Sequence, residues 1–191
     1  VVGLCKQRLP DNMGIPAGEI QVLSPTRKGV CGTVNLNRAL QSALNPPAAN
    51  KRQKIWGDLL LRQGDRVMQT KNNYDVVWES SDGAMGTGIF NGDVGIIEDI
   101  DPSGEMVTVR FDERTCIYTN EMLSQLELAY AMTVHKAQGS EYRAVVLVSA
   151  PVAPALMVRG VLYTAITRAR ELLVLVGDFD EDESAVKVES E

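Results

Sequence analysis

Two short stretches in the C-terminal third carry the residue types best suited to chemistry. In the first, residues 131–141, polar side chains crowd around Gly139, and glycine permits a sharp chain reversal at a strand edge. A loop of this kind, followed directly by a buried strand, is suited to holding phosphates. The residues alone leave a second interpretation open, in which the stretch is an ordinary polar loop and His135 has only a structural role.

The second stretch, residues 161–170, is predicted to be helical, with Thr164, Thr167 and Arg168 within one turn. Apolar neighbours bury one side of this helix, so packing can hold Arg168 at its end. An arginine fixed in this way can neutralise charge that develops on a transferred phosphoryl group, an effect worth roughly 10³ to 10⁵ in rate. The commoner fate of a helical arginine is a surface ion pair, here with Glu171 or another acid.

The pattern of predicted strands and helices around these stretches is typical of an α/β fold. Apolar runs predict buried strands at residues 19–24, 143–148 and 172–176. Helical spacing of apolar residues predicts helices over 33–44, with Thr33 as the N-cap, and over 158–169. Strand, helix and strand within one core predict a parallel sheet.

The middle of the chain is different, because short strands alternate there with glycine, asparagine and aspartate. Candidate strands lie at residues 66–70, 93–100, 105–111 and 116–118. Several short strands within so few residues favour a small antiparallel barrel. The glycines at 83, 86 and 88 are interpreted as an irregular loop between two of the strands.

The charge distribution supports this division. The net charge of −6 is unevenly spread: residues 1–57 hold 8 basic and 2 acidic residues, residues 58–128 hold 5 and 14, and residues 129–176 hold 5 and 2. Two outer segments of like charge around an acidic middle are typical of one basic domain with an acidic insertion. Residues 177–191 hold 1 basic and 7 acidic residues, and we expect 179–191 to be a disordered acidic tail.

Composition also argues against several classes of protein. No apolar run approaches the roughly 18 to 20 residues of a membrane span, and charge interrupts the N-terminus at once, so we expect a cytoplasmic protein without a membrane partner. The three cysteines are widely separated and form no CxxC pair. Neither a disulfide framework nor a metal site is predicted.

Three motifs in order resemble one known family. The stretches TVHKAQGSE and LYTAITRAR resemble motifs V and VI of superfamily 1 helicases of the RecD/TraA type, and IQVLSPTRKGVCGTVNLNRALQ resembles the start of their second motor domain. GDRVMQTKNNYD with GIFNGDVGII resembles the SH3-like barrel inserted in that domain. The resemblance implies an α/β, RecA-like second motor domain at residues 1–57 and 127–178, split by an SH3-like antiparallel barrel at 58–126.

The resemblance also implies a role for individual residues. Arg168 would be the arginine finger that contacts the γ-phosphate of ATP. One group would line the nucleotide side of the cleft: Gln138, Gly139 and Glu141. A second group would contact single-stranded DNA or couple it to the cleft, with Thr133 the better candidate for a phosphate contact: Thr133, His135, Thr26, Arg27 and Lys28.

Parts of the family pattern are missing from this sequence. It has no G-x-x-x-x-G-K-[ST] loop and no acidic pair after an apolar strand, the Walker A and B motifs that hold phosphate and Mg²⁺. ATP and Mg²⁺ would therefore bind only together with a first motor domain, and the chain alone is predicted to be inactive. The implied activity is 5′-to-3′ translocation on single-stranded DNA in repair or recombination, with subunits of a nuclease complex as further partners.

Two alternatives remain from the sequence. The chain could be the helicase part of a conjugative relaxase, which shares these motifs. It could also be a non-catalytic adaptor whose barrel docks DNA or a partner protein. A nucleotide hydrolase outside nucleic-acid metabolism is disfavoured, because it would leave the barrel unexplained.

Overall fold

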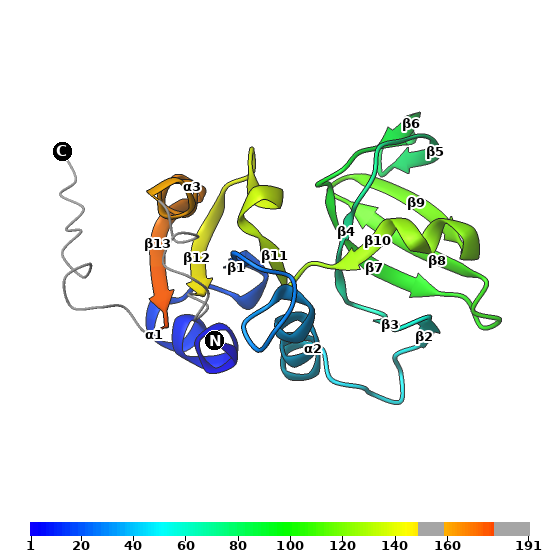
Figure 1. The fold of residues 1–191 in the computed structure, drawn as a ribbon. Helices are drawn as coiled ribbons and strands as arrows, with labels where there is room; N and C mark the ends of the chain where they lie inside the picture. The colour runs from blue at the N-terminus through cyan, green and yellow to red at the C-terminus, as the bar shows by residue number, and fades with distance from the viewer. Residues whose placement is uncertain (149–158, 178–191) are drawn as a thin grey trace. The chain divides into compact units, whose positions relative to one another are not determined.

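A computed structural model describes residues 1–148 and 159–177 of the chain. The chain forms two compact units: a first unit, Val1–Asn35 with Met132–Glu191, and a second unit, Leu36–Ala131. Figure 1 shows both units as ribbons. The tail predicted at 179–191 lies outside the described residues. Within the described residues, no helix is long and apolar enough to cross a membrane.

The first unit contains a four-stranded sheet in the order β11-β1-β12-β13. Its strands are β1 (Ile20–Ser24), β11 (Ala131–Thr133), β12 (Tyr142–Val148) and β13 (Ala169–Val176). β12 pairs in parallel with β1 on one side and with β13 on the other, which confirms the predicted parallel sheet. All five residues of β1 are buried, which confirms the predicted buried strand, although two of them, Gln21 and Ser24, are polar.

Short helical segments surround this sheet. The π-helix η1 (Leu4–Arg8), the helix α1 (Leu9–Met13) and the 3₁₀ turn η2 (Ala17–Glu19) precede β1, and the 3₁₀ turn η4 (Val134–Ala137) follows β11. The helix α3 (Arg159–Arg168) runs directly into β13 and packs against η4, β12 and β13. Ala165 is fully buried at that contact, so the apolar side of the predicted helix faces the sheet.

The second unit opens with most of the helix α2 (Thr33–Leu44), whose bounds confirm the predicted helix. Side chains of α2 reach the backbone of the strands around it. Asn37 donates through Nδ2 to the carbonyl oxygens of Leu128 and Ala131, both at 2.9 Å, and accepts from the Ala131 amide at 2.7 Å. This two-sided amide contact fixes α2 to the segment that leaves the second unit.

Most of the second unit is an antiparallel sheet of seven strands in the order β10-β4-β7-β8-β9-β5-β6. The strands β2 (Gln53–Trp56) and β3 (Leu59–Arg62) form a separate hairpin. Figure 1 shows that the sheet is strongly curved. The strands and the 3₁₀ turn η3 have these bounds: β4 (Arg66–Gln69), β5 (Asn73–Ser80), β6 (Met85–Ile89), β7 (Val94–Ile100), β8 (Met106–Phe111), β9 (Arg114–Thr119), η3 (Asn120–Gln125) and β10 (Leu126–Leu128).

The prediction of an irregular loop around glycines 83, 86 and 88 is wrong, because residues 85–89 form β6. Gly86 pairs with Trp78 on β5, and a Cβ atom at Gly86 would lie 2.3 Å from the Trp78 ring. Gly88 has a φ of 100°, and a Cβ there would lie 2.9 Å from the Phe90 ring. These glycines leave room for aromatic rings that pack across the strand, so they do not mark a break in it.

Candidate functional site

Arg168 is the last residue of α3, and its guanidinium reaches the loop before β12. Nη1 donates to the carbonyl oxygen of Ser140 at 3.2 Å, and Nη2 donates to Thr167 Oγ1 at 3.5 Å. Thr167 Oγ1 in turn donates to the carbonyl of Thr164 at 3.0 Å. The structure thus brings Arg168 to the loop that holds Gln138, Gly139 and Glu141, although these residues lie about thirty positions away in the sequence.

The guanidinium of Arg168 has no carboxylate partner among the described residues. The surface ion pair with Glu171 does not form, because Glu171 Oε1 accepts from Arg143 Nε at 2.8 Å. Arg168 Nε is buried and has no hydrogen-bond partner among the described residues. A buried donor without a partner is costly, so an unfilled one on a cation points to an anionic ligand.

The loop before β12 presents its polar side chains to solvent. The backbone turns at Gly139, whose φ of 88° lies in the left-handed region, and the Ser140 amide closes the turn onto the Ala137 carbonyl at 3.2 Å. Gln138 and Glu141 are exposed on either side of this turn. Val134 and Ala137 are buried beneath it, so η4 anchors the loop while the polar groups stay accessible.

Thr133 and His135 lie in the same continuous segment, where β11 passes into η4. Thr133 is half-buried and His135 is exposed. Both interpretations of the loop from the sequence, as a phosphate-binding loop or as an ordinary polar loop, fit this exposure of His135. Ser140 is one of the polar residues around Gly139, and sequence reasoning gave it no role of its own. Its backbone carbonyl, which no side-chain motif reveals, is the group that holds Arg168.

Hydrogen bonds between its own residues hold the loop after β1 in shape. Ser24 Oγ lies 2.7 Å from the Cys31 carbonyl, and Thr26 Oγ1 donates to the Lys28 carbonyl at 3.1 Å. The Thr33 amide donates to the Thr26 carbonyl at 3.0 Å, which folds the loop against the start of α2. A Cβ atom at Gly32 would lie 2.4 Å from the Lys28 carbonyl oxygen, so this closure requires glycine.

This folded loop presents basic side chains to solvent, since Arg27 and Lys28 are both exposed. It follows the carboxyl end of β1, whereas the 138–141 loop and Arg168 precede the amino ends of β12 and β13. Because β1, β12 and β13 are parallel, the two groups of predicted residues lie at opposite ends of the sheet. A five-residue strand separates them by roughly 15 Å, at about 3.3 Å per residue.

The geometry of this site suits an anionic group. A guanidinium held by neutral oxygen atoms keeps its charge available for an anion, and exposed polar groups surround it. Within residues 1–148 and 159–177, no three acidic, histidine or cysteine side chains come together in a way that could hold a metal ion.

Two family descriptions match the chain. The SH3 domain of ATP-dependent RecD-like DNA helicases matches residues 36–111, and the UvrD-like helicase C-terminal domain matches residues 128–176. These two matches confirm the resemblance to RecD/TraA-type superfamily 1 helicases. The α/β fold with an SH3-like barrel is confirmed as well.

Relatives at the sequence level carry RecD names. The ATP-dependent RecD2 DNA helicase of Deinococcus radiodurans is 38% identical over 160 residues, which cover 84% of this chain and 20% of that protein. The RecBCD enzyme subunit RecD of Mycolicibacterium smegmatis is 29% identical over 169 residues, covering 88% of this chain and 27% of that protein. The chain thus spans about a fifth to a quarter of the length of these relatives.

Solved structures of Pif1 helicase share the fold. Bacteroides Pif1 bound to single-stranded DNA aligns with a TM-score of 0.51 at 19% identity, over 85% of this chain and 42% of that one. Bacteroides Pif1 in complex with ADP-AlF3 and single-stranded DNA gives 0.52 at 19% identity, over 94% and 44%.

Proposed function

We propose that this chain is the C-terminal portion of an ATP-dependent DNA helicase. In this proposal residues 1–57 and 127–178 form the second motor domain and residues 58–126 the inserted barrel. The observation that carries the proposal is the state of Arg168, a cation fixed at a helix end. Among the described residues, one of its buried donors is unpaired and no carboxylate forms an ion pair with it. The family matches support the same function.

Arg168 is the proposed arginine finger. When bound, ATP supplies the phosphoryl transfer that drives movement along DNA. The Ser140 carbonyl holds the guanidinium so that its free donors face an incoming phosphate, and little reorganisation is needed when charge develops. Gln138, Gly139 and Glu141 are proposed to border the same nucleotide, since their loop carries the anchoring carbonyl.

The opposite end of the sheet is the proposed DNA contact. Lys28 and Arg27 are exposed on a loop whose shape is fixed by its own hydrogen bonds, which suits a contact with the phosphate backbone. Thr133 and His135 lie in the segment that leads from β11 to the nucleotide loop. We propose that this segment couples the two ends, so that opening and closing of the cleft changes the grip on single-stranded DNA.

A first motor domain with the Walker motifs is required for catalysis in this proposal. That domain would supply the phosphate loop and the residues that bind Mg²⁺, neither of which has a counterpart among the residues of this sequence. The 191-residue chain alone should therefore not hydrolyse ATP. The helicase would move 5′-to-3′, as the resemblance implies.

The decisive experiment is the single-stranded-DNA-stimulated ATPase rate of the whole helicase with Arg168→Ala. We expect the rate to fall by about 10³, with nucleotide binding retained, because the finger acts on the transition state. Arg170→Ala is the matched control. Arg170 is exposed, two positions further on, and should leave the rate within about twofold.

If Arg168→Ala and wild type hydrolyse ATP equally, Arg168 is structural and the finger assignment fails. If DNA stimulates neither protein, the adaptor alternative replaces the motor. The name of the Mycolicibacterium relative supports one further proposal, that the whole protein assembles with subunits of a nuclease complex. Size-exclusion chromatography of the whole protein from its own host tests that point.

A further inference from the structure

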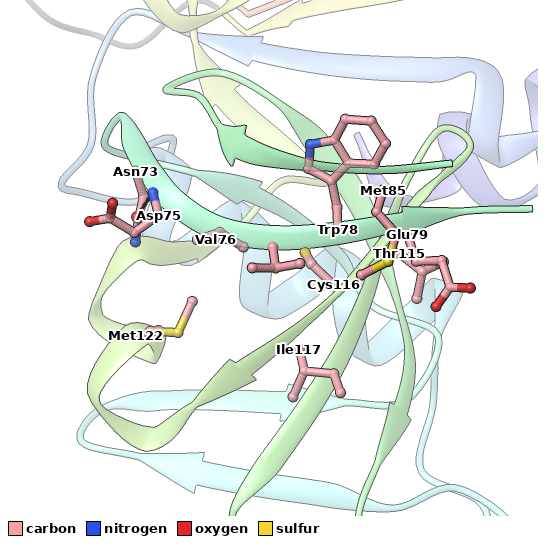
Figure 2. Close-up of a pocket in the computed structure, with 11 residues that line it drawn as sticks. Asn73, Asp75, Val76, Trp78, Glu79, Met85, Thr115, Cys116, Ile117 and Met122 are labelled. Carbon is pink, nitrogen blue, oxygen red and sulfur yellow. Dashed lines mark hydrogen bonds between the residues drawn. The ribbon is translucent and has the colours of Figure 1, made fainter. Parts of the chain in front are cut away.

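A hollow of about 410 Å³ opens on the second unit and is lined by none of the residues of the proposed nucleotide and DNA contacts. It lies where two neighbouring strands separate. β5 and β9 pair at Trp78–Ser80 with Arg114–Cys116, and within the described chain they do not pair with each other beyond these residues. Figure 2 shows the strands diverging, with Met122 of η3 at the far side. We call this hollow the wedge.

The floor of the wedge is apolar. Val76 and Cys116 are buried there at 5% and 2% exposure, while Ile117 on β9 is 52% exposed and Val77 on β5 is 55% exposed. Large apolar side chains on the open face of a sheet are costly to leave in water. A cluster of them that lines a hollow marks an interaction surface more often than scattered single residues do.

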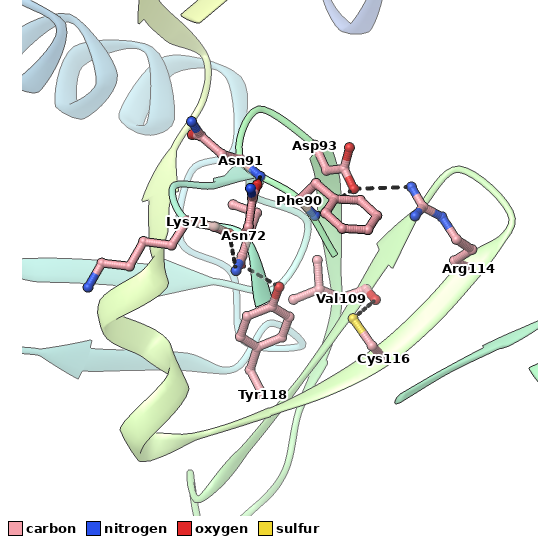
Figure 3. A network of polar contacts seen from close by, with 10 residues as sticks. Lys71, Asn72, Phe90, Asn91, Asp93, Val109, Arg114, Cys116 and Tyr118 are labelled. Atoms are coloured by element: carbon pink, nitrogen blue, oxygen red, sulfur yellow. Dashed lines mark hydrogen bonds and ion pairs between the residues drawn. The ribbon is translucent and has the colours of Figure 1, made fainter. Parts of the chain in front are cut away.

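The rim of the wedge is acidic. Asp75 and Glu79 are both exposed, and neither carboxylate has an ion-pair partner among the described residues. Figure 2 shows them toward opposite ends of the β5 stretch. The lining residues include no lysine, arginine or histidine. Arg114, the basic residue nearest along β9, is paired with Asp93 at 3.3 Å, as Figure 3 shows.

We propose that the wedge binds an extended segment of a partner protein that carries one apolar side chain between two basic ones. Before Trp78, β5 has no pairing with β9 within the described chain, so its backbone around Asp75 can accept an added strand. Glu79 lies in the part of β5 that pairs with β9, so an added strand reaches Glu79 only through a side chain. Asp75 and Glu79 are four residues apart, about 13 Å along a strand. In an extended partner, residues i, i+2 and i+4 face the same way, so basic residues at i and i+4 would flank an apolar residue at i+2.

The charge of the wedge favours a basic peptide over the other candidate ligands. Unpaired carboxylates without a lining cation repel the phosphates of nucleic acid. They also repel the chain's own residues 177–191, which hold 7 acidic and 1 basic residues. A basic and apolar peptide is therefore the complementary ligand, and this inference does not depend on the helicase proposal.

The probe is a fluorescent nine-residue peptide with lysine at positions 3 and 7, leucine at position 5, and serine or threonine elsewhere. We expect saturable binding to the full chain by fluorescence anisotropy. The same peptide with glutamate in place of both lysines should bind at least tenfold more weakly. Absence of saturable binding by the lysine peptide overturns the proposal.

The matched variants test the location. Asp75→Asn with Glu79→Gln should weaken binding at least tenfold, whereas Asp58→Asn with Glu105→Gln removes the same charge from exposed positions outside the wedge and should change it less than twofold. If the two double variants lose affinity for the peptide equally, the loss is due to net charge alone, and the proposal is overturned. Ile117→Ser, at a position that is 52% exposed, should weaken binding at least fivefold.

Two further outcomes reassign the wedge. Binding of fluorescent dodecathymidylate that Ile117→Ser weakens would assign the wedge to nucleic acid. Concentration-dependent sedimentation of the chain that Ile117→Ser abolishes would assign it to a second copy. Either result overturns the peptide proposal, and neither bears on Arg168.

Discussion

Two ionisable side chains, one in each unit, are held in opposite ways. Asp65 in the second unit is fully buried, and four donors reach its carboxylate: Gln41 Nε2 at 2.6 Å, Asn45 Nδ2 at 2.8 Å, the Arg62 amide at 2.6 Å and Tyr130 Oη at 2.9 Å. Arg168 in the first unit has a buried Nε with no partner among the described residues.

The difference separates structure from function. A buried charge whose hydrogen bonds are all made inside the protein stabilises the fold, because every neighbour depends on it. A charge with an unfilled buried donor contributes less to the fold and is available to a ligand. We therefore assign Asp65 to the architecture of the second unit and Arg168 to the site.

The largest effect on stability should come from Asp65→Ala. The change leaves the Gln41, Asn45 and Tyr130 donors without their acceptor inside the second unit. We expect the free energy of unfolding to fall by about 3–5 kcal/mol, the usual cost of breaking a buried charged network. Urea denaturation measures it, with exposed Asp58→Ala as a control that should stay within about 0.5 kcal/mol.

Removing a single donor should have a smaller effect. Tyr130→Phe deletes one hydrogen bond to Asp65 Oδ1 and leaves the bond from Asn45 Nδ2 in place. Burial and the neighbouring Asp65 carboxylate both raise the pKa of Tyr130, so the phenol stays a donor at all ordinary pH values. A loss of about 1 kcal/mol is expected in the same urea titration. No measurable loss would show that the network does not depend on this residue.

Arg168→Met is the corresponding change in the first unit. It removes the bond to the Ser140 carbonyl but also relieves the unpaired Nε, so the two effects oppose each other. The free energy of unfolding should change by less than about 1 kcal/mol in either direction. A loss above about 2 kcal/mol would place Arg168 with Asp65 among the structural groups and weaken the finger assignment.

The smallest expected effect concerns the reactivity of the cysteine thiols in the two units. Burial raises the pKa of Cys116 in the second unit to about 12 and that of Cys5 in the first to about 11. The thiolate is the reactive form, and it accumulates only as the pH approaches the pKa. At pH 8, about one Cys116 side chain in 10⁴ is therefore a thiolate. Half-exposed Cys31 should therefore be the thiol that a disulfide reagent modifies in the native chain. Fast modification of Cys116 would show that β9 opens readily.

The sequence predicted those features that local pattern controls. Mostly apolar runs indicated β1, β12 and β13, and helical spacing of apolar residues indicated α2 and α3, because burial on a regular element imposes its own period. Motif residue types indicated the site loops. The glycines near Trp78 were misinterpreted because a glycine that makes room for a ring from the next strand looks, locally, like a glycine in a loop.

Only the tertiary structure decided which groups meet. Glu171 pairs with Arg143 and not with Arg168, and the Ser140 carbonyl takes the place that a carboxylate could have filled. The convergence of four donors on Asp65 and the separation of β5 from β9 likewise depend on residues far apart in the chain. Local periodicity carries no information about such partners, because the packing of whole elements brings them together.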